Sequence, residues 1–326
     1  MVTDLKKDAL AAATGSQRFL SPAAAPADQG FAVLQVLVNS IVYASEIAVI
    51  AVGVSLCYSI LRFANFAHIQ LAVVGGYLCH AFSTLAHFPL PLAIFASAIA
   101  TGFIAILIDM LVFSRIRDIS PEGKMIVSWG VALFIRSMVA AIWGGSAQTF
   151  NVDTKVIVWH KTVFTSLDFT IVAATIVLMV ALHAYLYRTR IGSALRALAS
   201  NWELAVTRGI PGEKLIRLMW FLAGALAAIG GSLMAMQTRL QPSLDLLILL
   251  PVFAAVTIGG MSNVFGAVLG AIVLSFAQNF LIWFDFGSLF GGSPWHIPTQ
   301  FRDYVAVLAL VIMLLFRSGS KSTATR

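Results

Sequence analysis

Charged residues that could bind a solute or carry protons stand within otherwise apolar stretches of this sequence. Glu46 and Arg136 lie inside two separate apolar runs, while Asp109 and Asp245 lie near the ends of two others. A charge at the centre of a bilayer costs about 2.5–3.5 kcal/mol on insertion scales, so it needs a cavity or a partner. The pattern predicts either a solute or proton path or interhelical pairs, such as Glu46 with Arg136. Pairing is the favoured interpretation for Asp109 and Asp245.

Two apolar stretches, Leu61–Gly76 and Phe253–Gly270, are each interrupted by small or polar residues. The interrupting residues are Asn65 and His68 in the first stretch and Gly259, Gly260, Ser262 and Asn263 in the second. Paired broken helices in the two halves of a chain indicate a transporter binding site. Close helix packing also favours glycine-rich breaks, and Asn65 could cap the helix that follows it. Both interpretations stay open.

Motifs for covalent chemistry or nucleotide hydrolysis are absent from the sequence. Gly123 and Lys124 resemble the end of a phosphate-binding loop, but Asp118 stands where its first glycine belongs and Met125 follows the lysine. Neither HExxH nor GxSxG occurs, and the six histidines lack the spacing of metal ligands. The chain is therefore predicted to be no enzyme, with no catalytic residues and no metal or cofactor of its own.

The longest polar segment between apolar runs, residues 188–217, contains a helical pattern of its own. The apolar residues that recur at helical spacing are Ala194, Leu195, Leu198, Trp202, Ala205 and Val206. Gly209 is placed to end that helix. The pattern predicts one short helix over 194–209. It lies either on the membrane surface or against a partner protein.

The composition shows what kind of element must position these residues. Of the 326 residues, 60% are hydrophobic and only 11% are charged, whereas soluble domains carry about 25% charged residues. A spanning helix needs about 20 apolar residues. The apolar runs are 31–62, 68–88, 91–113, 125–143, 168–187, 219–238, 244–260, 263–284 and 303–316. They predict an all-α, polytopic transmembrane helical bundle with eight or nine membrane segments, some of them broken or re-entrant.

The predicted membrane domain, 31–316, is flanked by two polar segments. Residues 1–30 form a polar extension, predicted to be disordered, and residues 317–326 form a basic tail. If loop 188–217 is cytoplasmic, alternation places 13 lysines and arginines inside and 4 outside. The positive-inside rule therefore predicts that this loop and the C-terminus are cytoplasmic. The net charge of +7 fits this distribution. A nucleic-acid partner is not predicted, because the sequence offers no soluble domain with a basic face.

Three sequence blocks together resemble the permease subunits of branched-chain amino acid ABC importers. Asn65-Phe66-Ala67-His68 with Gly75-Gly76-Tyr77-Leu78 resembles the family's first signature, although Ile69 and Gln70 replace its glycine and acidic residue. Phe253-Ala254-Ala255 with Gly259-Gly260, Gly266-Ala267 and Gly270 resembles its second signature. Glu203-Leu204-Ala205 with Gly209 resembles the coupling motif of ABC-importer permeases, with Leu204 in place of a small residue.

The resemblance implies a transport subunit in a bacterial inner membrane. Its implied partners are a second permease subunit, two ATP-binding-cassette ATPases that use the ATP, an external solute-binding protein and membrane lipid. The implied solutes are branched-chain amino acids or relatives, including urea and short amides. The implied path residues are Asn65, His68, Gln70, Tyr77, Gly259, Gly260 and Ser262, and the implied ATPase-coupling residues are Leu198, Trp202, Glu203, Ala205, Val206 and Gly209.

A stand-alone secondary transporter is the alternative. In that case Glu46 would be the ion or proton site. The coupling-like loop distinguishes the two, because a carrier that needs no ATPase has no use for it.

Overall fold

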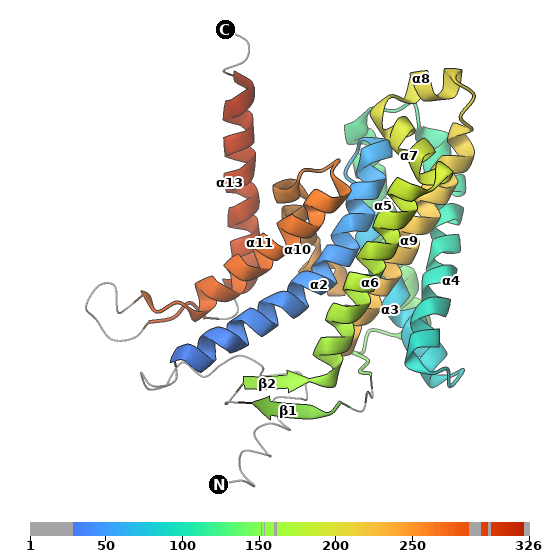
Figure 1. Cartoon of the computed structure of the whole chain (residues 1–326). Coiled ribbons are helices and arrows are strands. Elements are labelled where there is room, and N and C mark those ends of the chain that lie inside the picture. The colour runs from blue at the N-terminus through green and yellow to red at the C-terminus, as the bar shows by residue number, and fades with distance from the viewer. Residues whose placement is uncertain are drawn as a thin grey trace.

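The computed structural model describes residues 29–150, 152, 154–159, 162–286, 295–298 and 301–322 (Figure 1). The predicted extension 1–30 lies outside the described residues except for its last two, which begin a helix. The first helices are α2 (Gln29–Leu61), α3 (Ala67–Thr84), α4 (Leu90–Leu111), the 3₁₀ helix η2 (Phe113–Ile116), α5 (Pro121–Trp143) and α6 (Ser166–Arg188). They are followed by α7 (Arg190–Ser200), α8 (Trp202–Thr207), α9 (Gly212–Gln237), α10 (Leu244–Gly259), α11 (Val264–Trp283) and α13 (Arg302–Ser322).

The mostly helical prediction is confirmed, and each of the nine apolar runs forms a helix. In the described chain, six helices are long and apolar enough to cross a bilayer: α2, α4, α5, α6, α9 and α11. The count of eight or nine crossings therefore stays a prediction. The first run forms one continuous helix of 33 residues. The last helix continues through Ser322, six residues into the predicted tail, and residues 323–326 lie outside the described part.

Helix α9 lies at the centre of the bundle and packs against α2, α3 and α4. Close approach between α9 and α3 depends on glycine. A Cβ on Gly231 would collide with the backbone of Ala72, and one on Gly75 would collide with Ala228. Small residues let helix backbones approach, which is the main source of packing attraction between helices in lipid. The glycines thus determine how closely α3 lies against α9.

A two-stranded hairpin departs from the all-α prediction. Strands β1 (Val156–Trp159) and β2 (Thr162–Thr165) pair antiparallel at the end of the bundle opposite α8 (Figure 1). The Gln35 side chain of α2 accepts a hydrogen bond of 2.9 Å from the Val163 amide and so fixes the hairpin. Four-residue strands are too short to stand out in a sequence dominated by apolar helices, which is why the prediction missed them.

Candidate solute path and coupling loop

The first predicted break is the connection of residues 62–66 between α2 and α3. Arg62 has a φ of 58°, which lets the chain turn at the end of α2. The interpretation of Asn65 as the cap of α3 is wrong: Phe66 holds the cap position, and no side chain caps the helix. Asn65 is buried, and both polar atoms of its amide lack a hydrogen-bond partner in the described chain. The Cys57 thiol lies beside the Asn65 side chain.

Polar side chains continue from this connection into α3. His68 and Gln70 are fully buried, and none of their side-chain nitrogen and oxygen atoms has a partner of hydrogen-bonding geometry in the part described. The His68 ring lies beside the Ile50 carbonyl and over Gly53, where a Cβ would stand 2.6 Å from the ring. Interior polar groups are nearly always paired, so this run of unpaired atoms requires an explanation.

Tyr77 lies farther along α3, nine residues or about 13 Å from His68. Its ring packs against Trp143 of α5 at 5.3 Å between centroids, and its buried hydroxyl has no partner in the described chain. Three of the predicted path residues, His68, Gln70 and Tyr77, are therefore spread along α3 instead of gathering at one point, and Asn65 lies in the connection before it. His68 faces Gly53 of α2, whereas Tyr77 faces Trp143 of α5.

The second predicted break is the tight turn between α10 and α11. Gly260 has a φ of +93°, and the Asn263 side chain caps α11 by accepting a 3.0 Å hydrogen bond from Gly266. A Cβ on Gly259 would collide with the Gly266 carbonyl, so close packing explains this glycine. Ser262 is exposed. The break separates two helices and does not interrupt one.

The second turn contacts α2, and the first connection contacts α10. The Ser55 hydroxyl of α2 donates a 3.0 Å hydrogen bond to the Met261 carbonyl in the second turn. The Phe66 ring packs on Phe253 of α10 at 5.0 Å between centroids. The fold thus brings together the two sequence blocks that were singled out separately, although they lie almost 200 residues apart in the chain.

The predicted ion pair between Glu46 and Arg136 is wrong, because Arg136 of α5 pairs with Asp245 at the start of α10. Glu46 is buried in α2. The pairing interpretation of Asp109 is confirmed, since Asp109 binds Arg117 at 3.4 Å.

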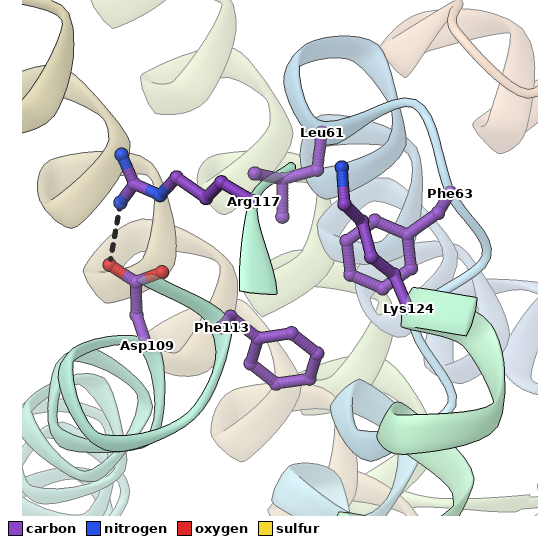
Figure 2. Close-up of a pocket in the computed structure, with 6 residues that line it drawn as sticks. All are labelled: Leu61, Phe63, Asp109, Phe113, Arg117 and Lys124. Atoms are coloured by element: carbon purple, nitrogen blue, oxygen red, sulfur yellow. Dashed lines mark hydrogen bonds and ion pairs between the residues drawn. The ribbon is translucent and has the colours of Figure 1, made fainter. Parts of the chain in front are cut away.

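Arg117 also pairs with Glu213 in the first turn of α9, which the sequence interpretation missed. Figure 2 shows Arg117 pointing toward Asp109 beside a small pocket. The pocket residues are Leu61, Phe63, Asp109, Phe113, Arg117 and Lys124. Through Asp109 and Glu213, the Arg117 guanidinium joins the end of α4 to the start of α9, the helix that follows α8 in the chain.

The coupling segment differs from the predicted single helix over 194–209. It forms two helices, α7 and α8, because Asn201 breaks the run and its side chain caps α8 by accepting from Leu204 at 3.0 Å. Leu198, Trp202 and Val206 consequently do not share one helical face. Leu198 is buried, whereas Trp202 and Val206 are exposed.

The remaining predicted coupling residues divide in the same way. Ala205 is buried and Glu203 is exposed beside the exposed Leu204. The prediction that Gly209 ends the helical segment is confirmed: α8 ends at Thr207, and Gly209 turns the chain with a φ of +85°. The sequence interpretation missed Arg62, whose guanidinium donates to the Ala199 carbonyl at the end of α7 and so joins the first connection to the coupling segment.

Comparison with known proteins gives one family and several relatives. The family model described as "Branched-chain amino acid transport system / permease component" matches residues 36–316. A probable branched-chain amino acid transport permease protein LivH of Methanocaldococcus jannaschii is 29% identical over 86% of this chain and 88% of its own length. The high-affinity permease protein BraD of Pseudomonas aeruginosa is 27% identical over 87% and 94%, and LivH of Escherichia coli K12 is 24% identical over 86% and 92%.

Among solved structures, a chain of PsaBC from Streptococcus pneumoniae in complex with Fab has a TM-score of 0.45 and 16% identity over 84% of this chain and 89% of its own. The family model covers all of the helices from α3 to α11 as well as the coupling segment. The chain belongs to the family of branched-chain amino acid transport permease components.

Proposed function

We propose that this chain forms the translocation path of an ATP-driven importer for branched-chain amino acids or related small solutes such as urea and short amides. The observation that carries the proposal is a set of buried polar side chains, Asn65, His68, Gln70 and Tyr77, whose polar atoms have no hydrogen-bond partner of good geometry among the described residues. The relatives named for branched-chain amino acid transport support the choice of solute.

Unpaired polar atoms in a membrane interior are costly for a purely structural protein. A buried donor or acceptor without a partner costs about 1–3 kcal/mol, and lipid offers no water to replace it. A passing solute that carries both donors and acceptors supplies those partners in turn. Gln70 and Tyr77, which are seven residues apart and so share one face of α3, therefore suit a path that binds solute briefly and releases it.

Energy for transport comes, in this proposal, from two ATPases in separate subunits. Helix α8 lies at one end of the bundle and exposes Trp202, Leu204 and Val206 (Figure 1). Apolar side chains on a short exposed helix suit a groove on a partner protein. A second permease subunit and an external solute-binding protein complete the proposed assembly in the inner membrane.

The proposed path predicts an unusual outcome for Gln70→Leu. Since both amide atoms of Gln70 lack partners in the described chain, an apolar side chain of similar size should leave the melting temperature unchanged or raised. Leucine uptake by cells in which the variant replaces the native chain should fall about tenfold. Ser137→Ala is the control, because Ser137 is exposed on α5 and bonds only to its own helix. A lower melting temperature with normal uptake would reduce Gln70 to a structural residue.

A further inference from the structure

The ion pair between Arg136 and Asp245 uses only part of what each side chain can bind. The bond joins Nη2 of Arg136 to Oδ2 of Asp245, and the two side chains are 22% and 7% exposed. The Nε of Arg136 and the Oδ1 of Asp245 are buried without a partner in the described chain. A donor on the positively charged side chain and an acceptor on the negatively charged side chain thus remain without partners in the described chain.

This arrangement is poorly suited to a purely structural role. A buried ion pair offsets its desolvation only when the remaining lone pairs and protons are also satisfied. Here they are not satisfied by any group in the described chain. Ionisable residues within membrane segments are functional candidates for this reason.

Branched apolar residues stand next to both members of the pair in the sequence. Ile135 and Val139 flank Arg136 on α5, and Leu244 directly precedes Asp245. These three residues belong to one buried cluster with Val73, Val74 and Tyr77 of α3. The Tyr77 hydroxyl is buried and has no partner among the described residues. Arg136 and Asp245 thus stand on the parts of α5 and α10 whose neighbouring residues pack into this apolar cluster.

The pair lies at the end of the bundle opposite α8. Asp245 is in the first turn of α10, and Arg136 stands seven residues, or about 10 Å, before the end of α5. The segments leaving these helix ends meet where Gln148 and Leu240 exchange backbone hydrogen bonds of 2.8 and 2.9 Å. With the orientation predicted from the lysine and arginine distribution, a solute arriving from outside meets this end first.

We propose that Arg136 and Asp245 form an entry site for a zwitterionic amino acid, which rests on the proposed function. Nε and Nη2 of Arg136 form a fork that matches a carboxylate in bidentate geometry. Asp245 takes the α-ammonium group, and the neighbouring apolar cluster that contains Val73, Val139 and Leu244 takes the branched side chain. The two residues pair with each other when the site is empty, and the zwitterion replaces that pair with two charge-assisted contacts.

The test measures binding to the full-length chain in nanodiscs by saturation-transfer difference NMR, which detects weak ligands. The probes are leucine, leucinamide without the carboxylate, and 4-methylpentanoate without the ammonium. The native chain should prefer leucine about tenfold or more over each analogue. Arg136→Gln should abolish the preference over leucinamide and keep that over 4-methylpentanoate, while Asp245→Asn should do the reverse. If Arg136→Gln does not fold, Arg136→Lys keeps the charge without the fork, and its preference over leucinamide should fall about threefold or more.

Arg117→Gln is the matched control, because it removes two ion pairs, with Asp109 and Glu213, at the opposite end and should change neither preference. Leucine binding with the native preferences in both the Arg136 and Asp245 variants would overturn this inference alone. Absence of leucine binding by the native chain would contradict the proposed solute path itself.

Discussion

Replacing Gly231 by valine is expected to prevent normal assembly of the bundle. A Cβ at this position would overlap the backbone of Ala72, which cannot move aside as a flexible side chain would. Overpacking typically costs about 1–3 kcal/mol, and a collision with backbone belongs at or above the upper end of that range. We expect little folded protein from membranes and a melting temperature well below that of the native chain, measured by size-exclusion chromatography and thermal unfolding in detergent.

Gly130→Val provides the control for this substitution. Gly130 lies on the exposed face of α5, and nothing stands within 4 Å of the place its Cβ would take. Its yield and melting temperature should equal those of the native chain. Equal stability of the Gly231 and Gly130 variants would show that α3 and α9 do not approach as closely as described.

Replacing Trp202 by alanine is expected to weaken binding of the proposed ATPase to this chain, while the chain itself stays in the membrane. The Trp202 side chain lies over Gly212 at the start of α9 and is still 39% exposed, so it can contact α9 and a partner together. An aromatic interface anchor often costs about 2 kcal/mol when truncated, or about a thirtyfold loss of affinity. Co-purification of the ATPase and solute-stimulated hydrolysis should both fall in this variant.

Two controls define what the Trp202 result means. Trp129→Ala removes a tryptophan of nearly equal exposure, 38%, from α5 and should keep both readouts normal. Gly209→Val should reduce both ATPase binding and solute-stimulated hydrolysis, because valine rarely adopts the φ of +85° found at this position. Gly209→Asn should be tolerated, since asparagine adopts that conformation more readily. Full ATPase binding and stimulation in both Trp202→Ala and Gly209→Val would make α8 a membrane-surface helix.

Apolar run length predicted the helices well, because a spanning helix must satisfy its own backbone and expose apolar side chains to lipid. The coupling segment shows where periodicity fails. Leu198, Trp202 and Val206 are spaced as if on one helix, but Asn201 between them caps a new one. A capping asparagine three residues before Leu204 was a readable signal, which the apolar pattern obscured.

The pairing of charges could not be predicted from the sequence. Arg136 pairs with Asp245 and not with Glu46 because the packing of whole helices brings the start of α10 beside α5, which no local pattern encodes. The burial of His68 and Gln70 depends likewise on α3 lying between its neighbours. The two segments that carry the family signatures nevertheless contact each other, through Phe66 before α3 and Phe253 in α10.

The central claim is that this chain is a solute path powered by a separate ATPase, and leucine accumulation in proteoliposomes tests it most directly. Vesicles holding the chain alone should neither hydrolyse ATP nor accumulate leucine, because the sequence has no phosphate-binding loop. Vesicles that also contain the partner subunits should accumulate leucine against its gradient when the solute-binding protein is outside and ATP is enclosed inside, on the side of the ATPases. Uphill accumulation by the chain alone under an imposed proton gradient, lost in Glu46→Gln, would contradict the account and establish a stand-alone carrier.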